Sequence, residues 1–265
     1  MPFTPAHAAA ALPFRRWSSP GPYIWPALVI GTIAPDLEYF LLLRGAARWG
    51  HDFVGSFAFC LPVGLLAMLL WTKLGHRAAL LLAPDDHRLR WWSTLERRYS
   101  AREWTLFIPF SLLVGSWTHL LWDAFTHQGR WGGKLIPAIE SVAFTIADRD
   151  FYWTNVFQQG STLLGMLILV IAYLNATRRR ERTTEPTPRL APVTRLTVVT
   201  LAIALPITFG LFYAAQRAAY TPGFEYYRAF IGSAARGTLA AWIAAAILVS
   251  VGIWFAAPPE RQPAP

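Results

Sequence analysis

The stretch Gly115-Ser-Trp-Thr-His-Leu-Leu-Trp-Asp-Ala-Phe-Thr-His-Gln-Gly129 closes a long apolar segment and places His119, Asp123 and His127 four residues apart. Each four-residue step along an α-helix turns only about 40° beyond a full turn, so the three side chains share one helix face. Two imidazoles and a carboxylate are typical metal ligands. Ionisable groups inside a membrane helix are costly, which indicates a functional role for this face.

The spacing limits how many of these residues one ion can bind. A rise of about 1.5 Å per residue separates His119 from His127 by roughly 12 Å, so one ion cannot easily take all three side chains. His119 with Asp123, or Asp123 with His127, can share an ion. The third residue would then serve a second ion, an outer layer of contacts or a substrate. The alternative is a polar seam that hydrogen-bonds between helices.

The composition is that of a helical membrane protein. The chain has 265 residues, of which 54% are hydrophobic and 15% are charged, whereas soluble domains carry about 25% charged residues. Its apolar runs are too long and continuous for the strands of a membrane barrel. The single cysteine, Cys60, excludes an internal disulfide and a cysteine-based zinc cage. We therefore predict an all-α polytopic membrane helix bundle of about six spans.

The predicted spans are residues 22–43, 53–74, 104–127, 156–175, 196–215 and 237–257. We expect the first span to be a broken helix near Pro35, because proline removes a donor and disfavours a helical residue before it. Residues 2–16 form an Ala-rich segment, capped by Thr4, that is too short to span. His7 is cytoplasmic if residues 22–43 make one complete span. It joins the other candidate ligands if residues 2–16 and 22–34 are two half-depth helices.

The distribution of arginines predicts the orientation. The formal charge is +9, and the arginines cluster beside apolar runs, which favours the positive-inside rule and anionic lipids over nucleic-acid binding. Loops 75–103 and 176–195 are the most basic, so we place both on the cytoplasmic side of an inner membrane. Loops 44–52, 128–155 and 216–236 then face outward. Arg15 and Arg16 follow the first apolar stretch instead of preceding it, which is the wrong order for a secretory signal peptide.

Four parts of the chain follow from these patterns. They are a motif-bearing membrane domain at 1–175, a basic Pro-rich cytoplasmic linker at 176–195, a two-span hairpin at 196–257 and a disordered tail at 258–265. The predicted topology brings the candidate ligands to one side of the membrane. The outward ends of three segments carry Asp36, His51, Asp52, His119, Asp123 and His127. This agreement is the main argument that they form one site.

Other polar residues near these ends have plainer interpretations. Asp36 is a helix cap or a ligand, and Asp52 is a cap or a partner of His51. We expect Glu38 to lie at the membrane interface. The remaining expectations are solvated side chains for His76 and His87, packing or interface roles for Trp117 and Trp122, and a cavity lining for Gln158, Gln159 and Ser161.

Four stretches carry a family resemblance. They are Met1-Pro-Phe-Thr-Pro-Ala-His-Ala-Ala-Ala-Ala-Leu-Pro13, Ala34-Pro-Asp-Leu-Glu-Tyr-Phe40, His51-Asp-Phe-Val-Gly55 and His119-Leu-Leu-Trp-Asp-Ala-Phe-Thr-His127. Together they resemble a family of bacterial membrane proteins, domain-of-unknown-function family 4184, over most of the chain. The family name implies no activity.

A second, weaker resemblance is to membrane-bound metal-dependent hydrolases of the inner membrane, and beyond them to zinc-dependent phospholipases C. It implies a ligand set of His7, Asp36, His51, His119 and Asp123. Those hydrolases often have His-Arg-x-x-Thr-His where this chain has His51-Asp-Phe-Val-Gly55. The second histidine of that pair is missing, and His127 is a candidate to replace it.

We therefore expect a metal-dependent hydrolase of a lipid or other membrane-associated phosphoester, with membrane lipids as partners and no nucleic acid. Asp123 or Asp36 would orient the water, and Arg130 or Arg149 would hold the phosphate. Zinc is the default ion, and manganese or iron also fits. The alternative is a non-catalytic scaffold whose His/Asp stripe is a polar seam or a structural metal site. Transport is disfavoured, because residues 196–215 offer only threonines as polar groups.

Overall fold

The computed structural model describes residues 4–17, 22–43, 48–146, 149–184, 187–221 and 223–256. The chain divides into two compact units. Unit 1 contains Met1–Glu38, Ala47–Met68 and Tyr99–Arg178, and unit 2 contains Tyr39–Ala46, Leu69–Arg98 and Arg179–Pro265. The predicted tail at 258–265 lies outside the described residues.

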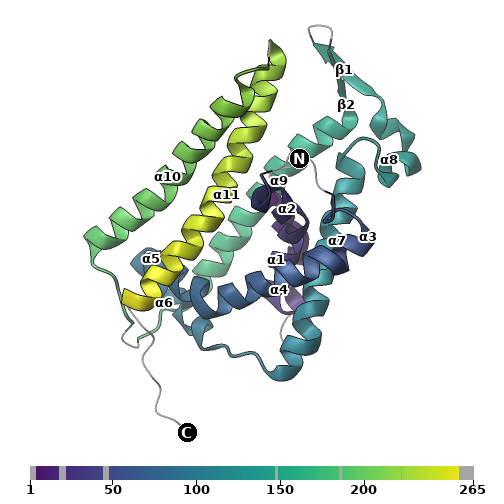
Figure 1. The fold of residues 1–265 in the computed structure, drawn as a ribbon. Helices are drawn as coiled ribbons and strands as arrows, with labels where there is room; N and C mark the ends of the chain where they lie inside the picture. Colours follow the sequence, from purple (N-terminus) through teal and green to yellow (C-terminus); the bar gives the residue numbers. More distant parts are fainter. Residues whose placement is uncertain are drawn as a thin grey trace. The chain divides into compact units, whose positions relative to one another are not determined.

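Unit 1 holds most of the short helical elements. They are a 3₁₀ helix Thr4–Trp17, α1 (Trp25–Ile33), a 3₁₀ turn Ala34–Asp36, α2 (Leu37–Leu41, which runs into unit 2), α3 (Phe53–Gly55), a π-helical turn Ser56–Cys60, and α4 (Leu61–Leu70, which also runs into unit 2). A π-helical turn Glu103–Phe107, α7 (Ile108–Thr126), α8 (Trp131–Leu135), a 3₁₀ turn Pro137–Glu140 and α9 (Trp153–Arg178) follow. A short antiparallel hairpin, β1 (Val142–Ile146) and β2 (Arg149–Tyr152), precedes α9. Figure 1 shows this hairpin above α9.

Unit 2 is built on two long helices that lie side by side, α10 (Pro192–Ala218) and α11 (Phe224–Ala256) (Figure 1). It also contains a π-helical turn Trp71–Gly75, α5 (His76–Leu82), α6 (Asp85–Trp91) and a 3₁₀ turn Trp92–Glu96. Ala78, Leu81 and Ile253 form a small buried core between α5 and α11.

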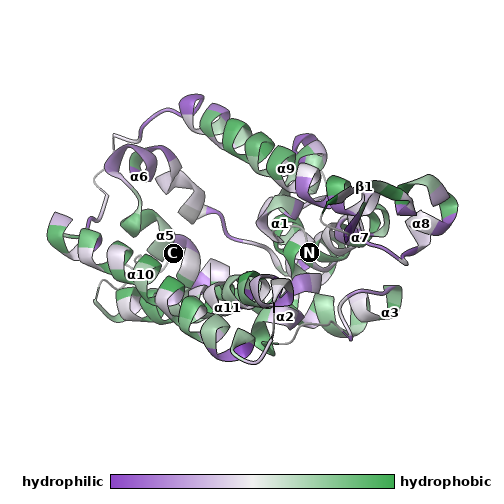
Figure 2. Cartoon of the chain, turned by 90° about the horizontal axis from the view of Figure 1, so that it is seen from above, coloured by the Kyte–Doolittle hydropathy of each residue, from purple (hydrophilic) through white to green (hydrophobic). Residues whose placement is uncertain are grey.

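Among the described residues, five helices are long and apolar enough to cross a membrane. They are Phe53–Leu82, Glu103–Thr126, Trp153–Arg178, Pro192–Ala218 and Glu225–Ala256. Hydrophobic residues cover most of α9, as Figure 2 shows. The prediction of an all-α membrane helix bundle is confirmed, and these helices indicate membrane association.

The predicted span at residues 22–43 is the main difference from the expected count of spans. As predicted, its helix is broken at Pro35, where the 3₁₀ turn Ala34–Asp36 separates α1 from α2. Neither piece is long enough to count as a span. The predicted loop 75–103 also differs, because its first residues continue the preceding helix to Leu82 and α6 follows.

Helices α1 and α7 pack at unusually close range. A Cβ atom on Gly31 would lie 2.3 Å from the carbonyl oxygen of Leu112, and one on Gly115 would lie 2.3 Å from that of Leu28. Only glycine permits such backbone contact, as in the small-residue interfaces of membrane helices. Ser116 reinforces the contact through a 3.2 Å hydrogen bond from its Oγ to the carbonyl of Gly31. This packing positions the last turns of α7 beside the break at Pro35.

Candidate metal centre

His119 and Asp123 lie on the buried face of α7. Their residues are 0% and 5% exposed, and His119 Nε2 is 3.4 Å from Asp123 Oδ2. The other ring nitrogen of His119, Nδ1, lies 2.8 Å from the carbonyl oxygen of Thr32. A carbonyl can only accept, so Nδ1 carries the proton and Nε2 presents its lone pair to the cluster. This backbone anchor is the arrangement that orients histidine ligands in metal sites.

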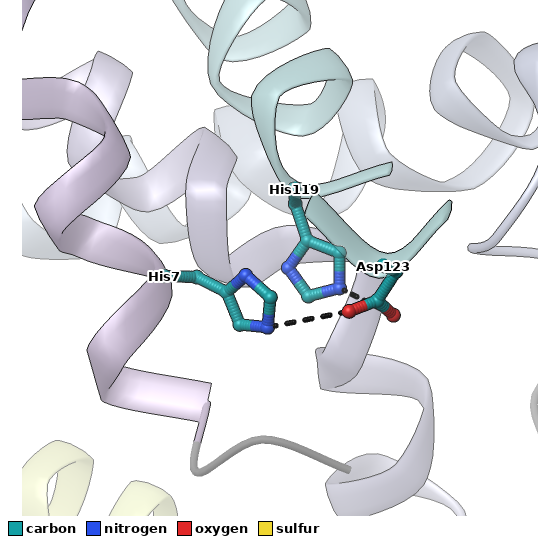
Figure 3. Close-up of side chains that lie close together, drawn as sticks. All are labelled: His7, His119 and Asp123. Atoms are coloured by element: carbon teal, nitrogen blue, oxygen red, sulfur yellow. Dashed lines mark ion pairs between the residues drawn. The ribbon is translucent and has the colours of Figure 1, made fainter. Parts of the chain in front are cut away.

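His7 reaches the same place from the N-terminal 3₁₀ helix. Its ring stacks on that of His119, with the centroids 3.8 Å apart, and its Nε2 lies 3.5 Å from Asp123 Oδ1 (Figure 3). Burial lowers the pKa of His7 to about 3, so its imidazole is neutral at pH 7. Of the two alternatives for His7, the structure has the one in which it joins the other candidate ligands.

Asp36 lies in the 3₁₀ turn that breaks the first apolar segment. Its Oδ2 accepts a 2.6 Å hydrogen bond from the Thr4 hydroxyl, and its Oδ1 lies 3.6 Å from His119 Nε2. His51, whose side chain is 7% exposed, places Nε2 3.2 Å from Asp36 Oδ1 and 3.8 Å from Asp123 Oδ2. The break near Pro35 thus delivers a carboxylate to the site.

The separations between these donor atoms fit ligands that share one ion. Bonds of about 2.1 Å to a first-row metal separate two ligand atoms by about 3.0 Å at 90° and about 3.6 Å at 120°. The five nitrogen–oxygen distances in the cluster lie between 3.2 and 3.8 Å. Two groups of three residues have donor atoms within 4.8 Å of one another: His7, His119 and Asp123, and Asp36, His51 and His119. Both groups need the one lone pair on His119 Nε2, which favours a single ion over two.

Several of these donor atoms have no hydrogen-bond partner within the described part of the chain. They are both ring nitrogens of His7, Nε2 of His119, Oδ1 of Asp36 and Oδ1 of Asp123. Each buried polar atom without a hydrogen bond lowers the stability of the fold by about 1–3 kcal/mol. Without a ligand, the cluster therefore destabilises the protein. As metal ligands, three imidazoles without added protons and two carboxylates would carry a formal charge of −2, which a divalent cation would neutralise.

His127 lies outside both groups of three. It follows the end of α7, with Nδ1 3.4 Å from Asp123 Oδ1 and 3.2 Å from the Thr126 hydroxyl. Its Nε2 lies 3.2 Å from the side-chain nitrogen of Gln158. Burial lowers the pKa of His127. Its position is that of a residue that orients Asp123 through an outer layer of contacts.

The other candidate residues have varied positions. Asp52 caps α3, as expected, and accepts a 2.6 Å hydrogen bond from Gly55 N. Arg130 Nη1 donates a 3.4 Å hydrogen bond to the carbonyl of His51, at the edge of the cluster. The backbone of Arg149 begins β2 in the exposed hairpin.

The remaining polar and aromatic residues differ in their surroundings. Trp122 packs edge-on against His7 and donates to Ser161 Oγ, and Trp117 donates to Ser56 Oγ. Of the two neighbouring glutamines in α9, Gln158 is buried and Gln159 is exposed. His76 is half-buried and lies 2.8 Å from the Thr94 hydroxyl, so the expectation of a solvated side chain was wrong for this residue.

Glu38 was expected at the membrane interface, and this prediction was wrong. Its residue is 0% exposed, and its carboxylate accepts three successive backbone N–H bonds, from Arg48, Trp49 and Gly50, at 2.7, 2.9 and 3.0 Å. It thereby fixes the loop that leads into His51. An acidic residue in the middle of an apolar run was the only signal in the sequence.

Comparisons with known proteins give one match. The family model described as "Domain of unknown function (DUF4184)" matches residues 1–251. No curated protein and no solved structure matches the chain. The weaker resemblance to metal-dependent hydrolases and phospholipases C therefore stays a prediction.

Proposed function

The chain belongs to the family described as a domain of unknown function, DUF4184, and from its site we propose that it is a membrane-embedded, metal-dependent hydrolase of a lipid or other membrane-associated phosphoester. One observation carries the proposal. Five buried side chains from four segments of the chain converge at ligand-to-ligand distances, and several of their donor atoms lack other partners among the described residues. The five are His7, Asp36, His51, His119 and Asp123.

The proposal assigns a role to each part of the site. The five side chains hold one divalent ion, which would supply Lewis-acid polarisation of a phosphoryl oxygen and a water with a pKa near 7. Asp36 and Asp123 each have a second carboxylate oxygen with which to orient a water. Arg130 is the candidate for holding the phosphate, because it contacts the backbone of His51.

The donor set narrows the choice of ion. Neutral imidazoles and carboxylates suit zinc, manganese and iron. Zinc sites usually have four ligands, whereas five donor side chains converge here. Zinc remains the default expectation, and manganese or iron accommodates the whole set.

A specific observation supports a second candidate, a structural metal site. His7, Asp36 and His119 are each at most 1% exposed, which is typical of closed sites. A plain hydrogen-bonded seam is less well supported, because a seam would satisfy the polar atoms that lack partners here. The hydrolase and the structural metal site both predict a bound metal, but only the hydrolase predicts turnover of a substrate.

The first test is metal content by mass spectrometry on detergent-purified protein. We expect one equivalent of a transition metal in the wild type and loss of that metal in His119→Ala and in Asp123→Ala. His87→Ala, a histidine of unit 2, is the matched control and should keep it. Protein that stays metal-free after zinc, manganese and iron are each supplied would overturn the proposal. Stoichiometric metal without turnover of any phospholipid or soluble phosphodiester would favour the structural site.

A further inference from the structure

A hollow of about 220 Å³ lies in unit 1 at the start of the span Phe53–Leu82. Its lining includes Arg48, Trp49, Asp52, Val54, Ala58 and Phe59. We call it the Arg48 hollow. His51, a candidate metal ligand, lies in sequence between Trp49 and Asp52. The hollow therefore adjoins the loop that carries the candidate ligand His51.

The loop that forms one wall is held firmly in place. Glu38 accepts hydrogen bonds from the backbone N–H groups of Arg48 and Trp49 at 2.7 and 2.9 Å. At the other end, Asp52 Oδ1 accepts from Gly55 N. Fixed backbone on both sides of His51 means that the hollow is pre-organised, which favours binding.

Two opposite charges line this hollow without neutralising each other. Arg48 and Asp52 are both exposed. Within the described residues no ion pair joins the Arg48 guanidinium to Asp52, and Asp52 Oδ2 remains available beside the capping oxygen. A guanidinium binds phosphate well, and a carboxylate binds an ammonium group. The pair is therefore complementary to a zwitterion.

The surface beside the hollow is apolar and exposed. Phe53, Val54 and Phe57 are 65%, 72% and 43% exposed, on a helix that begins a candidate span. Trp49, which lines the hollow, is 53% exposed, as is typical of aromatic residues at a membrane interface. The volume is smaller than the roughly 300–1,000 Å³ of pockets that enclose a drug-sized ligand. It suits a headgroup whose chains lie outside, against the apolar surface.

We propose that the Arg48 hollow binds a zwitterionic phospholipid with a primary ammonium, that is, a phosphoethanolamine headgroup. Arg48 binds the phosphate, Asp52 binds the ammonium, and the acyl chains lie along Phe53, Val54 and Phe57. This inference rests on the proposed function, because it names the class of lipid that would bind next to the proposed metal centre. The binding itself requires no metal.

The test is lipid binding measured by native mass spectrometry on the full-length protein. The ligands are dioleoyl phosphatidylethanolamine, phosphatidylglycerol, phosphatidylcholine and the soluble headgroup glycerophosphoethanolamine. We expect the wild type to prefer phosphatidylethanolamine. Arg48→Gln should weaken that binding about tenfold, because one charged hydrogen-bonding partner is lost. Arg228→Gln removes an equal charge from an exposed site in unit 2 and should change nothing.

Asp52→Asn gives the sharper result. Asparagine keeps the helix cap and removes the negative charge, so the preference for phosphatidylethanolamine over phosphatidylglycerol should disappear while the protein stays folded. The proposal is overturned if Arg48→Gln binds like the wild type, if Asp52→Asn keeps the preference, or if glycerophosphoethanolamine binds as tightly as the lipid. Metal content is measured in the same samples. A metal-free protein that still shows the Arg48 and Asp52 effects would sink the hydrolase proposal alone.

Discussion

The Nδ1 atom of His119 donates a 2.8 Å hydrogen bond to the backbone carbonyl of Thr32. This bond connects the metal centre to the packing between α1 and α7, because Thr32 follows Gly31, one of the glycines at which the two helices approach closely. Helix packing and ligand orientation therefore depend on each other.

Gly115→Ala should impair both the packing of α1 against α7 and the orientation of the ligand His119. Its new Cβ would lie 2.3 Å from the carbonyl of Leu28, so α1 and α7 must separate. We expect a loss of about 1–3 kcal/mol in the free energy of unfolding and weaker metal binding. Thermal unfolding in detergent and metal analysis measure the two effects. Gly160→Ala in α9 is the control, because its Cβ would meet nothing within 4 Å. Equal unfolding temperatures for the two variants would contradict this account.

His127→Ala should weaken metal binding without abolishing it. The residue lies outside both candidate ligand groups and contacts Asp123 at 3.4 Å. Loss of such an outer contact typically costs about 10–100-fold in affinity. Competition with a chelator measures the change against the wild type and His119→Ala. Complete loss of metal from purified His127→Ala would instead place His127 among the ligands.

Glu38→Gln should loosen the loop before His51. One amide oxygen cannot replace two carboxylate oxygens that accept three N–H bonds. Hydrogen exchange of residues 48–52 should rise, and metal affinity should fall. Glu225→Gln, an exposed residue of α11, is the matched control. Unchanged exchange in Glu38→Gln would show that the carboxylate does not hold this loop.

The basic linker should loosen in acid. A hydrogen bond from Arg195 holds the pKa of Asp85 below its ordinary value of 3.8, and one from Arg90 does the same for Asp86. Because the folded-state pKa values are depressed, this stabilisation is present above about pH 4 and is lost as the pH falls through the lower folded values. Hydrogen exchange of the 83–91 and 187–195 segments, corrected for intrinsic rates, should rise between pH 5 and pH 3.

The control for that titration is the double variant Asp85→Asn and Asp86→Asn. It should exchange rapidly at both ends of the pH range, because its side chains carry no charge to lose. High salt should weaken the effect in the wild type, since Asp85 is exposed and Asp86 is partly exposed. A pH dependence of the same size in the double variant would assign it to other groups.

The predicted orientation is tested with single cysteines in a Cys60→Ala background. Ser93 and Ser141 are both exposed, so serine-to-cysteine changes at these positions form a matched pair. A cysteine at Ser93 should resist an impermeant thiol reagent in intact cells, because loop 75–103 is predicted to be cytoplasmic. A cysteine at Ser141 should react, because loop 128–155 is predicted to face outward. The reverse pattern of labelling would invert the topology.

Sequence periodicity was sufficient to predict that His119 and Asp123 share one helix face, because residues four apart on a helix lie together. It left open whether Asp123 pairs with His119 or with His127. The break at Pro35 was also predictable, since proline acts locally. The convergence of His7 and His51 on this pair is a tertiary property. The orientation argument anticipated it for His51 but left two alternatives for His7.

Other features could not be predicted from local sequence patterns. The burial of Glu38 depends on a partner loop ten residues away, and no periodicity reports such a contact. The role of Gly115 depends on the backbone of α1 lying against it. The β1–β2 hairpin lies in a segment of mixed composition and α6 lies in a polar one, and both segments were predicted as loops.

The candidate ligands are residues 7, 36, 51, 119 and 123. An ion bound to them would cross-link the chain across three long intervals of sequence. Such a link restricts the unfolded chain most where the enclosed loops are longest. During synthesis the site cannot close until α7, which carries His119 and Asp123, has been made. Metal binding would then occur only after the segments that carry His7, Asp36 and His51 have assembled with α7.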